Sequence, residues 1–208
     1  MSEFRNSFGE SIFRNKYALN ETQTWSEKVK DIVTDVCTGI LEKDDMDVLE
    51  KAMKEFKFMA GGRYIYYAGR QASFYNNCYL LKGEEDTREE WGKLVQRASD
   101  CLMSGGGIGI DYSVFRPSGS PLGRTGGEAS GPLPLMNSIN EIGRNVMQGG
   151  SRRSAIYASL NWQHGDAHQF LTAKDWHSLP IADGVTVFDA KQNNFNFPAP
   201  LDMTNISS

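Results

Sequence analysis

The strongest constraint on the fold of this chain is a helix–glycine–helix–glycine series between residues 87 and 155. Thr87 and Glu90 have the spacing of a capping box, in which each side chain binds a free N–H group at the start of a helix. Apolar residues then recur at helical spacing over 87–104 and again over 133–147. Both segments end at glycines, which adopt helix-ending backbone angles without strain. The series therefore predicts two helices, each followed by a glycine-rich loop.

Both loops carry arginine among glycines. The first loop covers residues 115–132 and the second covers 148–154. Between Asp111 and Arg153 there are five arginines, three acidic residues and no lysine. Because guanidinium groups bind phosphates through two parallel hydrogen bonds, the loops favour a phosphate-bearing ligand. Ordinary surface arginines are the alternative interpretation.

The composition excludes several classes of protein. A net charge of −4 over 208 residues argues against general nucleic-acid binding. The sequence has no apolar run long enough to span a membrane and no apolar stretch typical of a secretory signal at its start. Its three cysteines form neither a disulfide framework nor a zinc-ligand pattern. We expect a reduced, cytoplasmic protein that lies outside membranes.

The first part of the chain is predicted to be helical. Residues 1–20 form an aromatic-bearing arm, in which Phe4, Phe8, Phe13 and Tyr17 are spaced to dock on a core. Thr24 and Glu27 form a second capping box ahead of a helix to Ile40. A shorter helix is expected to follow, and 59–70 are expected to form a loop.

Strand-like segments alternate with these helices in the second part of the chain. They lie at 74–81, 108–113 and 155–160. This order is typical of an α/β protein. Near the third segment, Asp166 is expected to cap a short helix, and the chain ends in a segment that resembles another strand.

Several residues could carry chemistry. Cys78 lies in an apparent strand, where it is either an inert buried thiol or a redox cysteine whose partner lies outside this chain. His164, His168 and His177 could bind a metal, but exposed or capping histidines are the preferred interpretation. The acidic turn 84–86 either complements the dipole of the helix that follows or accepts ribose hydroxyls.

Taken together, these motifs resemble the catalytic subunit of ribonucleotide reductase. The resemblance covers roughly residues 56–206 and keeps the order of the motifs. Its components are Asn77-Cys78, the acidic turn, Gly105–Gly109, Arg116, Gly119-Ser-Pro121, Gly126-Gly-Glu-Ala129 and Gln148-Gly-Gly-Ser-Arg-Arg153.

The resemblance implies the fold and the domain organisation. The family's fold is a ten-stranded α/β barrel, and this chain would supply its first half. We expect a helical N-terminal segment over 1–58 and the first half of the barrel over 59–208. The helices at 87–104 and 133–147 resemble the pair that builds a four-helix homodimer interface. The family's ATP-binding N-terminal cone is not recognisable here.

The resemblance also assigns roles to residues. Cys78 would be one of two cysteines that reduce the 2′ position of a ribonucleoside di- or triphosphate and become a disulfide. Substrate contacts would come from Asn77 and Gly107, and from Gln148 and Arg152 of the second loop. A dNTP or ATP effector would bind the remaining residues, which are Glu85, Asp86, Arg116, Leu122 and Arg124.

The motif variants look most like class II, the adenosylcobalamin-dependent branch, so that cofactor and a thioredoxin-like reductant are expected. The radical cysteine and the second redox cysteine of the family lie beyond this sequence. We therefore expect the chain to need the C-terminal half of a reductase for turnover. The alternatives are a non-catalytic nucleotide-binding regulatory fragment and a generic α/β binding domain.

Overall fold

The computed structural model describes residues 3–146, 154–194, 197 and 206–207. The chain divides into two compact units, residues 1–76 and 77–208. Residues 59–76, which the sequence assigned to the barrel part, belong to the first unit, because Ile65 and Ala68 are buried in its core. No helix in the described ranges is long and apolar enough to cross a membrane.

The first unit is helical and packs around a cluster of aromatic side chains. Trp25 stacks on Phe56 with ring centroids 5.3 Å apart, and both rings contact Phe4. Its elements are α1 (Ser7–Ile12), the π-helix η1 (Phe13–Tyr17), α2 (Trp25–Cys37), α3 (Lys43–Lys54) and α4 (Gly62–Tyr67). The last of these replaces the loop predicted at 59–70, because Ile65 on α4 packs into the core.

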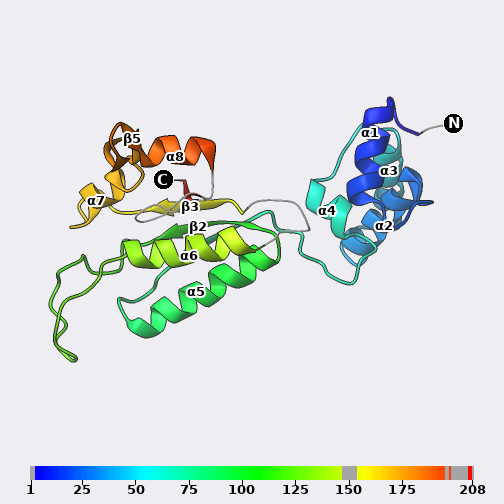
Figure 1. Ribbon diagram of the computed structural model, residues 1–208. Coiled ribbons are helices and arrows are strands. Elements are labelled where there is room, and N and C mark those ends of the chain that lie inside the picture. The colour runs from blue at the N-terminus through cyan, green and yellow to red at the C-terminus, as the bar shows by residue number, and fades with distance from the viewer. Residues whose placement is uncertain (1–2, 147–153, 195–196, 198–205, 208) are drawn as a thin grey trace. The chain divides into compact units, whose positions relative to one another are not determined.

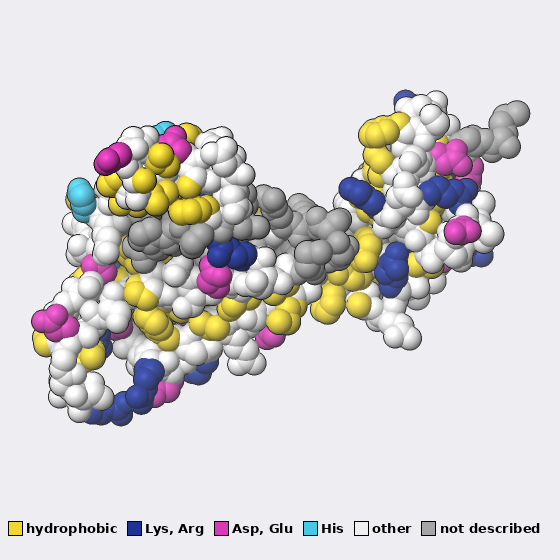
Figure 2. All heavy atoms as spheres, in the orientation of Figure 1, with side chains coloured by type: hydrophobic (Ala, Val, Ile, Leu, Met, Phe, Trp, Pro, Cys, Tyr) yellow, Lys and Arg dark blue, Asp and Glu magenta, His cyan; other side chains and the backbone are white. Residues whose placement is uncertain are grey.

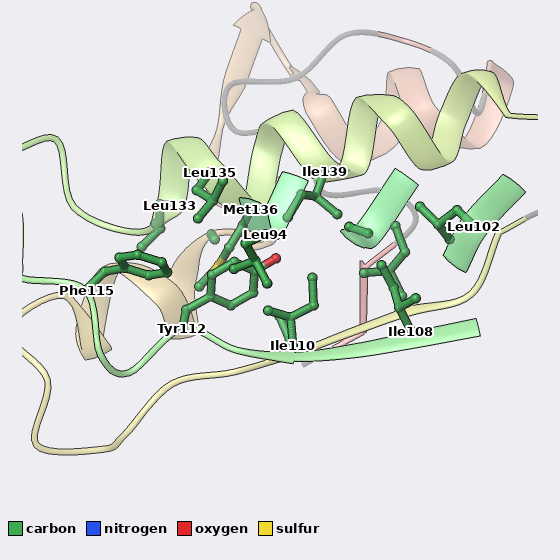
Figure 3. Packing of buried hydrophobic residues seen from close by; sticks show 14 residues of the cluster. Leu94, Leu102, Ile108, Ile110, Tyr112, Phe115, Leu133, Leu135, Met136 and Ile139 are labelled. Carbon is green, nitrogen blue, oxygen red and sulfur yellow. The ribbon is translucent and has the colours of Figure 1, made fainter. Parts of the chain in front are cut away.

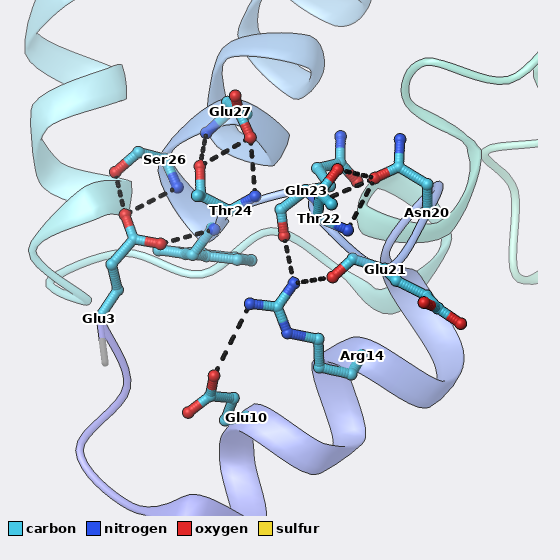
Figure 4. Close-up of polar contacts among 11 residues, drawn as sticks. Glu3, Glu10, Arg14, Asn20, Glu21, Thr22, Gln23, Thr24, Ser26 and Glu27 are labelled. Atoms are coloured by element: carbon cyan, nitrogen blue, oxygen red, sulfur yellow. Dashed lines mark hydrogen bonds and ion pairs between the residues drawn. The ribbon is translucent and has the colours of Figure 1, made fainter. Parts of the chain in front are cut away.

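The predicted capping box at the start of α2 is confirmed. The Thr24 hydroxyl accepts from the Glu27 N–H group, and the Glu27 carboxylate accepts from the Thr24 N–H group (Figure 4). Glu3 adds a second carboxylate there by accepting from the Trp25 and Ser26 N–H groups. The arm is therefore fixed to α2 through polar contacts as well as rings. Phe8 does not dock as expected, since its side chain is 73% exposed.

The second unit is built on a parallel sheet with strand order β1-β2-β3-β6. The bounds are β1 (Cys78–Lys82), β2 (Gly107–Asp111), β3 (Ile156–Ser159) and β6 (Ile206–Ser207). Helix α5 (Arg88–Met103) connects β1 to β2, and α6 (Leu133–Asn145) lies between β2 and β3. This is the alternation that the sequence predicted, and Figure 1 shows α5 and α6 side by side along the sheet.

The core of this unit lies between these two helices and β2. Ile108 and Ile110 of β2 point toward Leu94 and Leu102 of α5 and toward α6 (Figure 3). Because the apolar faces of both helices pack against their own sheet, the dimer interface expected from the resemblance would have to use other side chains. Met103 is one exposed apolar candidate, with 66% of its side chain accessible.

The opposite face of the sheet has much less cover. Burial alternates along β1, so that Cys78, Leu80 and Lys82 are exposed while Tyr79 and Leu81 contact the core. Leu80 is 85% exposed. Parallel strands in α/β proteins are normally covered on both faces, so this open face is the side on which further protein or a ligand would be expected.

The remaining elements of the second unit follow β3. They are α7 (Ala167–Thr172), the short 3₁₀ helix η2 (Trp176–Ser178), an antiparallel pair of β4 (Pro180–Ala182) and β5 (Val185–Thr186), and α8 (Val187–Asn193). Thr186 and Asp189 form a complete capping box at the start of α8.

Candidate functional site

A cavity of about 280 Å³ lies beyond the C-terminal ends of β1 and β2. Its wall combines the start of α5 with parts of the segment that links β2 to α6. Asp86, Thr87 and Trp91 line it from the first element, and Arg116 and Gly131 line it from the second. The cavity therefore brings together a carboxylate, a guanidinium group and an aromatic ring.

The Asp86 carboxylate and the Arg116 guanidinium form an ion pair inside this cavity. Nε of Arg116 donates to Oδ2 of Asp86 at 2.5 Å, and Nη2 approaches the Asp86 carbonyl oxygen at 3.5 Å. Both side chains remain about one-third exposed, so a ligand can reach them. An exposed pair of this kind contributes little to stability, at most about 1 kcal/mol, and is free to exchange partners.

The start of α5 is held in place by polar contacts of its first turn. The Thr87 hydroxyl accepts from the Glu90 N–H group as predicted. The second half of the capping box is absent, because the Glu90 carboxylate accepts instead from the Glu84 N–H group and pairs with Arg97. Burial opposes ionisation of Glu90, but these hydrogen bonds and charges lower its pKa below the usual value. The acidic turn, which includes Asp86, is thus bound to α5.

The linking segment 117–131 is a hairpin arm rather than an irregular loop. Leu122 N–H donates to the Gly127 carbonyl, and Pro121 pairs antiparallel with Glu128. Gly126 and Gly127 both have positive φ at the turn, which glycine tolerates best. Lys and Arg side chains gather where the arm and the start of α5 lie, as Figure 2 shows.

The predicted effector residues fall into two groups. Asp86, Arg116 and Leu122 line the cavity. Arg124 is exposed on the arm and is not among the lining residues. The pKa of Glu89 is lowered mainly by the hydrogen bond from its own backbone N–H group and by Arg88, and to a smaller extent by the charge of Arg124. Arg124 therefore lies within electrostatic reach of the start of α5. Glu85 is exposed and also lies outside the lining.

Cys78 lies at the other end of β1 and faces the open side of the sheet. Its register partner on β2 is Gly107. A Cβ atom built on Gly107 would lie 3.7 Å from the Cys78 Sγ atom, so the glycine leaves space directly beside the thiol. Cys78 is exposed and forms no disulfide with Cys37 or Cys101. Burial of this thiol, which one of the two interpretations from the sequence expected, is therefore wrong, and its redox role stays a prediction.

Asn77 and Gly107 are joined through their backbones. The Gly107 N–H group donates to the Asn77 carbonyl at 2.9 Å, and the Ile108 N–H group donates to the Ala155 carbonyl at 3.0 Å. The glycine turn, the thiol and the residue before β3 are consequently neighbours. Gln148 and Arg152, predicted to contact substrate, lie outside the described residues.

The histidines predicted as exposed or capping occupy different positions. His164 is half-buried beside the arm and bonds to the Phe115 carbonyl, whereas His168 and His177 are exposed. The described part of the chain contains no group of three or more His, Cys, Asp or Glu side chains placed to hold a metal ion. Asp166 does not cap α7 with its side chain, in contrast to the prediction, because its carboxylate binds the arm.

Comparison with known families gives a match over more than half of the chain. Residues 76–183 match the family described as "Ribonucleotide reductase, barrel domain". The chain is 27% identical over 174 residues to the ribonucleoside-diphosphate reductase large subunit of Arabidopsis thaliana, covering 82% of this chain and 21% of that protein. It is 30% identical over 152 residues to the vitamin B12-dependent ribonucleoside-diphosphate reductase of Thermoplasma acidophilum, covering 70% of this chain and 20% of that protein.

Solved structures give the same fold. The alpha subunit of the class Id ribonucleotide reductase of Actinobacillus ureae superimposes with a TM-score of 0.69 at 16% identity, covering 83% of this chain and 31% of that one. The chain spans about a fifth of the length of the curated relatives it matches.

Proposed function

The chain belongs to the ribonucleotide reductase large-subunit family, and on that premise we propose that it supplies the first reducing cysteine and the effector-binding site of a ribonucleotide reductase. The complete enzyme would convert ribonucleotides to deoxyribonucleotides for DNA synthesis. The fold prediction is confirmed: a helical N-terminal segment precedes strands and helices of the reductase barrel, and the described residues do not close that barrel.

The observation that carries the proposal is the position of Cys78. Its thiol is exposed on the open face of the sheet, directly beside the space left by Gly107. A ribose held against the glycine turn would lie next to this sulfur. Reduction replaces the 2′-hydroxyl with hydrogen and releases water, and two thiols supply the two electrons and two protons as they become a disulfide. The second thiol would come from another part of the complete enzyme.

We further propose that the cavity at the other end of β1 binds a nucleotide effector. Asp86 offers a carboxylate for a sugar hydroxyl, and Arg116 offers a guanidinium group for a phosphate once their ion pair opens. Trp91 and Phe115 supply an apolar wall, and their rings pack edge to face with centroids 6.1 Å apart. We assign the direct contacts to Asp86, Arg116 and Leu122, while Arg124 would act on the phosphates through longer-range attraction.

We propose that α6 links the two sites. This helix begins next to the cavity at Leu133 and ends at Asn145, close in sequence to the proposed second loop with Gln148 and Arg152. Ser154 and Ala155, which follow that loop, contact Gly143 of α6 and Ile108 of β2. An effector could thus bias the substrate end if the helix or its loops have two arrangements of different affinity.

The cofactor and the assembly are proposed from the family alone. Some relatives are vitamin B12-dependent by name and others are not. Adenosylcobalamin is proposed on this basis, and none of the described residues is assigned to bind it. A homodimer through α5 and α6, a thioredoxin-like reductant and a cytoplasmic location are proposed on the same basis.

Turnover in a reconstituted enzyme tests the function. This chain should give no reduction alone and should reduce ribonucleotides when the C-terminal half of a related large subunit and its radical generator are supplied. Cys78→Ser should abolish that reduction. If Cys78→Ser retains it while dNTP binding is intact, the chain is instead the non-catalytic nucleotide-binding fragment.

A further inference from the structure

His164, Gly165 and Asp166 dock on the start of the hairpin arm at three successive points. Nε2 of His164 lies 2.7 Å from the Phe115 carbonyl oxygen. The backbone at Gly165 lies against Pro117 so closely that an added Cβ atom would be 2.7 Å from the proline ring. The Asp166 carboxylate accepts from the Ser118 N–H group at 3.0 Å. These contacts fasten the main chain on both sides of Arg116.

The same carboxylate also marks the far end of the arm. Gly131 has a φ of +73°, and a Cβ atom there would lie 2.3 Å from Oδ2 of Asp166 and 2.9 Å from the Ser118 nitrogen. Only glycine fits this position. Asp166 is 7% exposed, and its carboxylate lies beside Ser118 and Gly131. We call these two ends of the arm, together with residues 115–117, its stem.

The tautomer of His164 follows from its neighbours. The Asp166 N–H group lies 3.0 Å from Nδ1 and can only donate, so Nδ1 accepts. The ring proton is then on Nε2, which donates to the Phe115 carbonyl. The neutral imidazole thus bridges the segment that carries Asp166 to the segment that carries Arg116. A further tie joins the same segments, since the Asn161 N–H group donates to the Ser113 hydroxyl at 2.8 Å.

We propose that His164 and Asp166 are positioning residues that clamp the stem of the arm and so set the Arg116 side chain against the nucleotide cavity. This role rests on the proposed function, because the cavity is the assigned effector site. Phe115, Arg116 and Gly131, which line the cavity, all lie on the clamped stem. Neither clamp residue lines the cavity itself.

The test combines hydrogen exchange with dNTP titration of the full chain. Asp166→Ala removes the acceptor for Ser118, whereas Asp166→Asn keeps one acceptor oxygen. Loss of a buried hydrogen bond predicts exchange about fivefold to thirtyfold faster at 115–131 in Asp166→Ala, and a dNTP Kd raised by at least about fivefold. Asp166→Asn should stay within about threefold of wild type in both measurements. His164→Phe keeps a ring without polar atoms and should act in the same direction as Asp166→Ala.

Asp183→Ala is the matched control, because Asp183 is an exposed carboxylate in the turn between β4 and β5. Unchanged exchange at the stem in both Asp166→Ala and His164→Phe would overturn the clamp. Faster exchange with an unchanged Kd would overturn its positioning role. If the wild-type chain binds no dNTP, both the proposed effector site and the role of the clamp in nucleotide binding are wrong. Hydrogen exchange at the stem still decides whether the clamp exists.

Discussion

Arg116 donates from Nε to the Asp86 carboxylate at 2.5 Å across thirty residues of sequence, and this contact joins the hairpin arm to the start of α5. In the free chain each charge satisfies the other. A nucleotide that takes the carboxylate with a hydroxyl and the guanidinium group with a phosphate would replace one weak, exposed pair with two charge-assisted contacts.

Arg116→Ala should therefore weaken dNTP binding by about tenfold or more, because hydrogen bonds to charged groups contribute about 1.5–3 kcal/mol. Arg116→Lys should recover only part of the affinity, since lysine cannot bind a phosphate through a planar fork. Isothermal titration calorimetry measures both. Arg14→Ala is the control, because Arg14 pairs with Glu10 in the first unit and does not line the cavity. Equal affinities for Arg116→Ala and Arg14→Ala would remove Arg116 from the site.

Two adjacent glycines should respond differently to alanine. At Gly106 a Cβ atom would lie 2.4 Å from the Tyr79 ring, so Gly106→Ala should lower the unfolding free energy by about 1–3 kcal/mol. At Gly107 the nearest atoms are 3.4 Å away or more, so Gly107→Ala should leave stability nearly unchanged.

Gly107→Ala should nevertheless impair reduction in the reconstituted enzyme, because the new methyl group would occupy the space beside the Cys78 thiol. Thermal denaturation and turnover measured on the same preparations separate the two effects. Full activity in Gly107→Ala would argue against a substrate at this turn.

The open face of the sheet gives a third prediction. Leu80→Ser should reduce aggregation of the chain and leave its unfolding free energy within about 0.5 kcal/mol of wild type, because Leu80 is 85% exposed. Leu94→Ala, on the covered face, should cost about 2–5 kcal/mol, since Leu94 is fully buried. Light scattering and urea denaturation measure these outcomes. A large stability loss in Leu80→Ser would show that this face is packed in solution.

Lys28 gives the first unit a pH dependence. The side chain is fully buried, and Nζ donates to the Ala68 carbonyl at 2.6 Å. Burial, as the larger cause, and the charge of Arg70, as the smaller one, lower the pKa of Lys28 to about 8. An unfolded lysine has a pKa of about 10.4, so the unfolded state binds more protons between these values. The unfolding free energy of this unit should therefore rise with pH from about 8 to 10.4, by up to about 3 kcal/mol.

Hydrogen exchange of α2 and α4 at pH 7.5 and pH 10, corrected for intrinsic rates, measures this change. Lys28→Met should abolish the rise. Lys43→Met should preserve it, because Lys43 is exposed and its pKa is raised by Asp47. A wild-type unit that loses stability over this interval would contradict the assignment to Lys28.

Local sequence patterns predicted the regular elements well. The capping box at Thr24, the helices that became α2, α5 and α6, and the strands expected near 74–81, 108–113 and 155–160 all follow from periodicity and turn residues close in sequence. The parallel pairing of Cys78 with Gly107 agrees with the α/β order predicted from the alternation of helices and strands.

The errors arose where distant contacts decide local structure. Glu90 has the spacing for a capping box, but Arg97 and the Glu84 N–H group compete successfully for its carboxylate. Asp166 has the position of a helix cap, but it binds Ser118, which is 48 residues away. Residues 62–67 form a helix because Ile65 finds a core to pack in. No signal within a short window of sequence reports such partners.

The most direct test of the central claim is to follow the Cys78 thiol through a single turnover. The chain is prereduced, combined with the C-terminal half of a related large subunit and its radical generator, and given ribonucleotide without external reductant. Alkylation and mass spectrometry should then find Cys78 in a disulfide in proportion to the deoxyribonucleotide formed, and Cys78→Ser should form no product while binding dNTP normally. Product formed while Cys78 stays fully alkylatable would contradict the account.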